Sequence, residues 1–232
     1  MPQGEYVDVE ETDIRQSRLE TIGSAAAGIA HDLNNQFTLI LNHLAVSDFA
    51  SAYDAVSRCV ALTSGLLAWC RGESAPLKPT DLAAAVRRFA ARAGIPEHIR
   101  LNVEIAEDVS TVLGDETGID RALDNLFRNA CAAMNANGKI RIVVRSGEIH
   151  VEDSGPGIAP ENLPRIFEPF FTTRGSSLNR ACGSGLGLAI VRDIMRRHGG
   201  SVTVQSTPGA GATFTLHFRP AKGGVAIQAV QS

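Results

Sequence analysis

Apolar residues recur at spacings of three and four through the first third of the chain, which is typical of amphipathic helices. One face of a long helix is formed by Leu19, Ile22, Ala26, Ile29, Leu33, Phe37, Ile40 and Leu44. A turn at residues 46–48 follows, with Ser47 or Asp48 as the expected N-cap of a second helix. The pattern predicts helices over about residues 14–46 and 48–71. Because two helices with one apolar seam bury little surface, we expect them to self-associate into a dimeric four-helix bundle.

The pattern changes near residue 75, where prolines, glycines and β-rich runs replace the helical periodicity. Two prolines mark residues 76–80 as a linker between a first domain at 1–75 and a second at 81–219. In the second domain we expect helices at 81–93, 116–135 and 185–198, and strands at 100–105, 139–145, 148–152, 201–206 and 212–218. Since helices alternate with antiparallel-looking strands, this predicts a two-layer α/β sandwich. Residues 220–232 have no evident partner element and are expected to fray.

The composition excludes several classes of protein. A hydrophobic fraction of 44% in 232 residues is enough for a core, so the chain is not disordered as a whole. A formal net charge of −3 offers no basic surface for nucleic acid. No apolar run reaches the roughly 20 residues that span a bilayer, and the acidic N-terminus is no signal peptide, so we expect a cytoplasmic protein. The four cysteines are widely spaced, which predicts neither a zinc site nor a disulfide framework.

His31 lies on the polar face of the first predicted helix. The residues one turn away are small or polar: Ala27, Gly28, Asn34 and Asn35. We therefore expect an imidazole ring that is open to solvent. Asp32 could fix its tautomer and raise the basicity of the other ring nitrogen, and Asn35 could hold a water molecule beside it. The alternative is an ordinary surface histidine.

Two glycine clusters, at residues 153–158 and 183–188, are candidates for a phosphate site. The second cluster opens a predicted helix, where backbone N–H groups and the helix dipole favour a phosphate. Neither cluster is a Walker A motif or a dinucleotide fingerprint. Asn125 and Asn129 lie four residues apart beside an apolar stripe, and their amide oxygens suit Mg²⁺, although surface or capping asparagines are the alternative.

These elements, in this order, resemble the transmitter module of bacterial sensor histidine kinases. The matching boxes are the H box (28–35), the N box (125–130), the G1 box (153–157), the F box (166–173), the G2 box (183–188) and a last glycine turn (209–214). The resemblance implies an all-α helical hairpin, dimeric as a four-helix bundle, followed by an α/β two-layer sandwich of the Bergerat type that binds ATP, as in gyrase, Hsp90 and MutL. It also implies that the γ-phosphoryl group of ATP moves to His31 and then to an aspartate of a response regulator, with phosphatase activity in some members of the family.

The resemblance further implies roles for individual residues. Asp153 would read the adenine amino group, Asn129 would ligate Mg²⁺, and Asn125 would support phosphates or metal. Asp32 would be the acid–base partner of His31, and Asn35 would position a hydrolytic water. The pocket and a lid between residues 171 and 183 would be shaped by Gly155, Gly157, Gly183, Gly185 and Gly187, with Leu186 and Thr213 as further cofactor-binding residues. Thr172, Thr173 and Arg174 would begin the lid, with Arg174 near the γ-phosphate.

Three features depart from the family pattern. The hairpin is short beyond His31, the N box continues with Cys131 and Ala132 where polar residues are usual, and little sequence precedes the first helix. We therefore expect the input to come from a separate sensor protein, or the chain to be a piece of a longer, hybrid kinase.

Two other functions fit parts of the pattern. One is a phosphorelay or docking module without kinase activity, which would not need the glycine boxes. The other is an ATPase or serine kinase of the same superfamily, which would not need the His31-Asp32 pair.

Overall fold

The computed structural model describes residues 33–53, 55, 56, 59, 63, 75–134, 137–173 and 185–221. The chain divides into two compact units. The first contains residues 1–73 and 180–184, and the second contains residues 74–179 and 185–232. No helix among the described residues is long and apolar enough to cross a membrane.

The first unit contains a helix over residues 33–45, a turn, and a second helix that begins at residue 49. The turn residue Ser47 has a φ of 58°, and Asp48 caps the second helix by accepting a hydrogen bond from the Ser51 N–H at 3.1 Å. The hydrogen bonds from Ser51 hold the pKa of the Asp48 carboxyl below its usual value. Ala52, Ala55 and Cys59 are buried in this unit. The predicted helical residues before residue 33 lie outside the described part of the chain.

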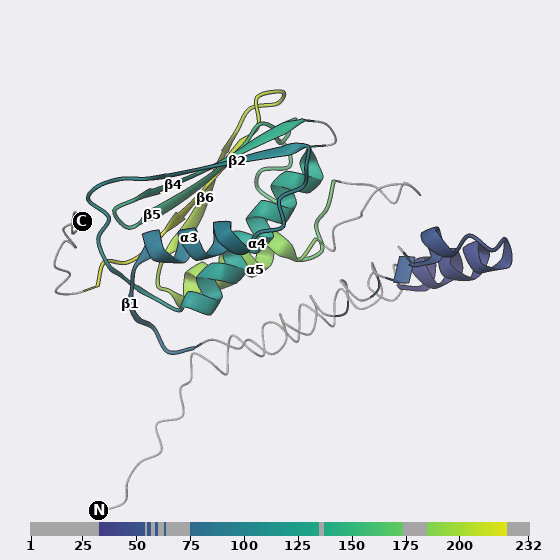
Figure 1. Cartoon of the computed structure of the whole chain (residues 1–232), viewed down its shortest axis with the longest axis horizontal. Coiled ribbons are helices and arrows are strands. Elements are labelled where there is room, and N and C mark those ends of the chain that lie inside the picture. The colour runs from purple at the N-terminus through teal and green to yellow at the C-terminus, as the bar shows by residue number, and fades with distance from the viewer. Residues whose placement is uncertain are drawn as a thin grey trace, which may run out of the picture. The chain divides into compact units, whose positions relative to one another are not determined.

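The second unit is a two-layer α/β sandwich. Its five-stranded sheet has the order β2-β4-β5-β7-β6, and the three helices α3, α4 and α5 cover one face of that sheet (Figure 1). The strands are β2 (Ile99–Ile105), β4 (Gly138–Arg145), β5 (Glu148–Asp153), β6 (Ser201–Ser206) and β7 (Ala212–His217), and the helices are α3 (Leu82–Arg92), α4 (Glu116–Ala133) and α5 (Gly187–Arg197). The predicted layer architecture of this unit is therefore confirmed.

The sheet is mixed, not antiparallel throughout. β2 pairs in parallel with β4, whereas the β4–β5, β5–β7 and β6–β7 pairs are antiparallel. A second, two-stranded sheet pairs β1 (Lys78–Thr80) with β3 (Val112–Gly114). Residues 78–80, predicted as linker, thus form a strand. The expected partnerless tail also begins with pairing, because Pro220 bridges Val112 and the Ala221 N–H donates to the Thr111 carbonyl at 3.1 Å.

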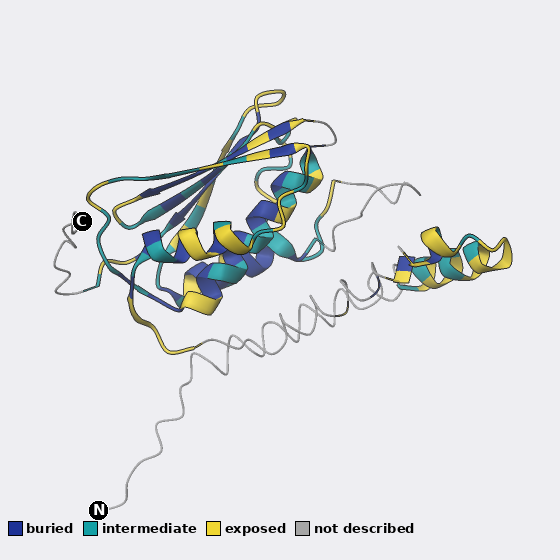
Figure 2. Ribbon diagram, viewed as in Figure 1, coloured by how far each residue is buried: buried dark blue, intermediate teal, exposed yellow. Residues whose placement is uncertain are grey.

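The core lies between the sheet and the helices, and its residues follow the predicted periodicities (Figure 2). In β4 and β5, alternate residues such as Ile140, Ile142 and Ile149 are buried, as a sheet with one covered face requires. α4 buries a stripe that includes Leu126 and Phe127, while Asp115 caps its first turn. The ring of Phe127 meets that of Phe89 of α3 edge to face, with centroids 5.7 Å apart.

Candidate functional site

Asn125 and Asn129 project from α4 beside its buried stripe, and both are half-buried. The first turn of α5 lies against them: a methyl group added to Gly187 would stand 3.2 Å from Oδ1 of Asn125 and 3.5 Å from Nδ2 of Asn129. The Nδ2 atom of Asn125 donates to the Arg121 carbonyl at 2.8 Å, so its oxygen faces the start of α5. The structure thus brings together three of the predicted site residues.

The start of α5 has no side-chain cap. The N-cap position is held by Leu186, whose side chain is buried and makes no capping hydrogen bond. Helix N-termini carry partial positive charge and N–H groups that lack intrahelical partners. Gly187 itself adds no side chain to this terminus, and a helix start of this kind can receive an anion such as a phosphate.

Asp153 is the last residue of β5 and lies near the last turn of α4, beyond Asn129. Its Oδ1 accepts a hydrogen bond from the Gly155 N–H at 2.8 Å. A methyl group on Gly155 would stand 3.5 Å from Cβ of Ala133, which lies one helical turn beyond Asn129. The end of β5 and the last turn of α4 are therefore in contact, and the Asp153 carboxylate lies at that junction.

Two glycines with left-handed backbones fix the loop after Asp153. Gly157 has a φ of 71° and packs on the Thr207 carbonyl, whereas Gly211 has a φ of 88° and packs on the carbonyl of Asp153 itself. A side chain at either position would overlap backbone atoms as well as strain the chain. The loop after β5 and the turn between β6 and β7 therefore hold one another in place.

Gly185 joins two segments that lie apart in sequence. Its carbonyl accepts the Phe170 N–H at 3.0 Å, and both residues have a positive φ, 68° and 66°. Beside this contact, the Arg165 guanidinium lies 4.4 Å from the centre of the Phe171 ring. The F box and the start of α5 are thus linked directly, and the exposed Thr172 and Thr173 follow that link.

Comparison with known proteins agrees with this geometry. Residues 114–222 match the family described as histidine kinase-, DNA gyrase B- and HSP90-like ATPase. A solved catalytic domain of histidine kinase ThkA is 31% identical, with a TM-score of 0.52, over 63% of this chain and 97% of that domain. This chain belongs to the histidine kinase family. A larger structure of ThkA, in complex with the response regulator protein TrrA, has the same fold over 95% of this histidine kinase, with a TM-score of 0.75 and 24% identity.

Curated relatives of this histidine kinase include two proteins of Escherichia coli K12. The signal transduction histidine-protein kinase AtoS is 31% identical over 86% of the chain, and the sensor histidine kinase ZraS is 30% identical over 87%. The chain spans 35% of the length of AtoS and 46% of that of ZraS. It therefore corresponds to a part of each relative.

Several predicted site residues of this histidine kinase lie outside the described residues: His31, Asp32, Arg174 and Gly183. Asn35 lies exposed on the helix of residues 33–45 in the first unit. Among the residues that the structure describes, no three His, Cys, Asp or Glu side chains could hold a metal ion together.

The structure does not bring Thr213 to Asp153. Thr213 pairs with Glu152, and Ala212 is the residue opposite Asp153. Because neighbouring residues of a strand face opposite sides of a sheet, Asp153 and Thr213 point to different faces. Ala212 is therefore the residue of β7 that lies on the same side of the sheet as Asp153, a placement that only the strand register reveals.

Two of the four cysteines lie within the described residues. Cys59 and Cys131 are free thiols, and burial raises the pKa of the Cys131 thiol. Cys131 lies two residues after Asn129 on α4 and is half-buried. Cys70 and Cys182 lie outside the described residues.

Proposed function

We propose that this chain is the phosphoacceptor and ATP-binding part of a two-component histidine kinase. It transfers the γ-phosphoryl group of ATP to His31 and passes that group to an aspartate of a response regulator receiver domain. The observation that carries the proposal is the approach of Gly187 to Asn125 and Asn129, 3.2 Å and 3.5 Å from the position of an added methyl group. A bare helix start beside two amide groups suits a triphosphate and its hard cation.

The nucleotide would lie between the end of β5 and the start of α5. The Asp153 carboxylate would accept a hydrogen bond from the adenine amino group, and Asn129, with support from Asn125, would hold Mg²⁺. The Mg²⁺ ion would neutralise charge on the phosphate oxygens when bound. Gly187 would let the start of α5 approach the ligand, and Gly155, Gly157 and Gly185 would shape the loops around it. Support comes from the family match over residues 114–222 and from the similar kinase ShkA, solved with AMPPNP.

His31 would act as the nucleophile in the first unit. A ring nitrogen attacks the γ-phosphorus, the bond to the β–γ bridging oxygen breaks, and ADP leaves. Asp32 would hold the ring and accept its second proton, which favours the neutral nucleophile. An aspartate oxygen of the receiver domain then takes the phosphoryl group from His31. Asn35 would orient water for hydrolysis of the phosphorylated receiver, which is the phosphatase reaction.

The first unit would form the predicted dimeric four-helix bundle. Large apolar side chains are exposed on its described residues, among them Leu41, Phe49 and Tyr53, with exposed fractions of 67%, 68% and 73%. A second copy would cover such a surface, since exposed apolar patches mark interaction sites. The proposed domains are residues 1–75 and 81–219, to which the second unit adds β1 at residues 78–80 and the paired residues 220 and 221.

The proposed partners are a receiver domain and a separate sensor or input protein, in the cytoplasm where ATP is available. ThkA, which shares the fold, has been solved with the response regulator protein TrrA. Because the chain spans less than half of AtoS and of ZraS, input domains of such relatives would lie in the remaining sequence.

The test is incubation of the full chain with γ-labelled ATP and Mg²⁺. Label that is acid-labile and alkali-stable should appear on the wild type and be absent from His31→Gln. The matched control is His43→Gln, because His43 lies on the described helix of residues 33–45 and pairs with Asp48 at 3.3 Å in the hairpin turn. It should retain the label.

Each other outcome has its own meaning. Acid-stable label that persists in His31→Gln would indicate a serine kinase instead. Nucleotide binding without label would indicate a phosphatase-biased or partner-dependent protein. Absence of nucleotide binding would favour a phosphorelay module.

A further inference from the structure

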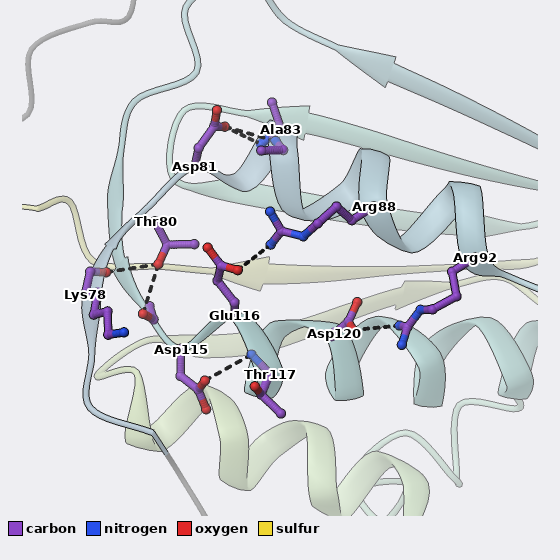
Figure 3. A network of polar contacts seen from close by, with 12 residues as sticks. Lys78, Thr80, Asp81, Ala83, Arg88, Arg92, Asp115, Glu116, Thr117 and Asp120 are labelled. Atoms are coloured by element: carbon purple, nitrogen blue, oxygen red, sulfur yellow. Dashed lines mark hydrogen bonds and ion pairs between the residues drawn. The ribbon is translucent and has the colours of Figure 1, made fainter.

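The boundary between the two units falls between residues 73 and 74, and we define the interdomain linker as residues 75–77, which are attached to the strand that leads into α4. Residues 75–77 run directly into β1, which pairs with β3 in the register Lys78↔Gly114 and Thr80↔Val112. The buried Thr80 hydroxyl donates to the Gly114 carbonyl at 2.9 Å and tightens this pairing (Figure 3). The residue after Gly114 is Asp115, the N-cap of α4. The linker therefore reaches the start of the helix that carries Asn125 and Asn129.

The two carboxylate oxygens of Asp115 have different partners. Oδ1 accepts the Thr117 N–H at 3.0 Å and caps α4 (Figure 3). Oδ2 accepts the N–H of the linker residue Ala75 at 3.3 Å. Asp115 is 5% exposed, whereas Ala75 is exposed, so the carboxylate is buried and its bond to Ala75 lies at the edge of the second unit. One side chain thus holds the linker and the helix together.

His198 connects the same point to the end of α5. Its Nε2 accepts the backbone N–H of Asp115 at 2.8 Å, and its Nδ1 lies 2.8 Å from the Ile194 carbonyl. Because the amide can only donate and the carbonyl can only accept, the ring carries its proton on Nδ1. A methyl group on Gly118 would stand 3.0 Å from both the His198 ring and the Asp115 carboxylate. Glycine there allows the close approach.

α4 and α5 are consequently in contact at two levels. Gly118 faces His198 at one end, and Asn129 faces Gly187 at the other. The two contacts are eleven residues apart along each chain segment, from 118 to 129 and from 187 to 198. At 1.5 Å per helical residue this is about 16 Å. The two helices run antiparallel, and a shift of one against the other at His198 moves Gly187 against Asn129 by the same amount.

We propose that Asp115 and His198 form a joint that couples the interdomain linker to the nucleotide site. The two residues are positioning residues, since neither faces the Gly187 end where the nucleotide would lie. The inference rests on the proposed function for the binding of nucleotide at that end. Coupling between two sites is reciprocal: nucleotide stabilises the Ala75–Asp115 bond by the factor by which that bond strengthens nucleotide binding.

The experiment measures amide exchange at Ala75 by NMR in the full chain, with and without AMPPNP and Mg²⁺, beside nucleotide affinity by calorimetry. Nucleotide should slow exchange at Ala75 by about fivefold or more. Asp115→Asn keeps an acceptor for the helix cap but lacks the second one. The Ala75 amide of this variant should therefore exchange rapidly with or without nucleotide. Its Kd for nucleotide should rise by the same factor by which nucleotide slows exchange at Ala75 in the wild type.

Three further variants separate coupling from folding. His198→Leu removes the acceptor for the Asp115 N–H and should abolish the effect of nucleotide on Ala75. His198→Gln places an oxygen near the Nε2 position and should restore it. Asp81→Asn is the matched control, because Asp81 caps α3 by hydrogen bonds from Ala83 and Ala84 without touching the linker amide or α5. It should change neither quantity by more than about twofold.

The outcomes distinguish the two proposals. Wild-type protein that binds AMPPNP with no change at Ala75 would overturn the joint and leave the kinase proposal standing. Equal effects of Asp81→Asn and Asp115→Asn on exchange at Ala75 and on the Kd would also overturn it, because the loss of any helix cap would then explain the result. Failure of the wild type to bind nucleotide at all would overturn the proposed function, and the joint with it.

Discussion

Gly187→Ala should separate nucleotide binding from folding. Gly187 is the first residue of α5 and its φ is not in the left-handed region, so alanine fits the backbone there. The added methyl group would stand 3.2 Å from Oδ1 of Asn125, a contact that a shift of a few tenths of an ångström relieves. The substitution therefore fills the space beside the two asparagines without disturbing the core.

The two free energies should change differently. Alanine is favoured over glycine in a helix by up to about 1 kcal/mol, and the tight contact with Asn125 offsets part of that gain. We expect the free energy of unfolding to stay within about 1 kcal/mol of the wild type. Nucleotide affinity should fall at least about tenfold, or about 1.4 kcal/mol, because the methyl group occupies the place where phosphate oxygens would meet the helix start.

Calorimetric titration with AMPPNP and Mg²⁺ measures the affinity, and urea denaturation measures the stability. Gly94→Ala is the matched control: no atom lies within 4 Å of its added methyl group, and its φ is not left-handed. It should leave the affinity unchanged. If Gly187→Ala binds nucleotide within twofold of the wild type, phosphates do not lie at the start of α5 and the proposed site is wrong.

Three more predictions concern other parts of the second unit. Asp153→Asn should reduce the preference for ATP over GTP about tenfold in competition titrations, because a carboxylate accepts from the adenine amino group whereas an amide can also donate to a guanine carbonyl. Phe89→Ala should lower the free energy of unfolding in urea by about 3–5 kcal/mol, since the ring is buried against Phe127. Hydrogen bonds from Arg141 lower the pKa of Glu104 below its ordinary value of 4.5, so this ion pair stabilises the fold above that pH and is lost as the pH falls through the folded pKa. The melting temperatures of wild type and Arg141→Met should therefore converge in acid, and a gap that is the same at pH 7 and pH 3 would contradict this.

Local sequence signals predicted most elements of the second unit. α4 has an apolar stripe and an acidic cap, and the helix runs from Glu116 to Ala133, within two residues of the expected end. β5 and the first half of β4 alternate in burial, and a tight turn at Ser146-Gly147 joins the two strands, so their pairing could be predicted as well. Such elements are defined by contacts between neighbours in sequence, which a periodicity detects.

Pairings between distant segments could not be predicted in this way. β1 contains Pro79 and is three residues long, and it becomes a strand only because β3 lies beside it. The parallel pairing of β2 with β4 depends on the crossover through α4, not on the composition of either strand. Asp115 and His198 are 83 positions apart, and no sequence pattern around either residue predicts that the two are in contact.

The glycines of the site show why a motif has to be combined with geometry. Gly157, Gly185 and Gly211 have left-handed backbones and pack on carbonyl or backbone atoms, so folding alone accounts for them. Gly187 differs, because a helix there would be more stable with alanine and no backbone atom is among the three nearest to its added methyl group. What the methyl group would meet is the pair of amide side chains on α4. Neither a left-handed backbone nor a close backbone atom requires glycine at position 187, so substitution of Gly187 tests the proposed ligand site directly, whereas substitution of Gly157, Gly185 or Gly211 would first disturb the fold.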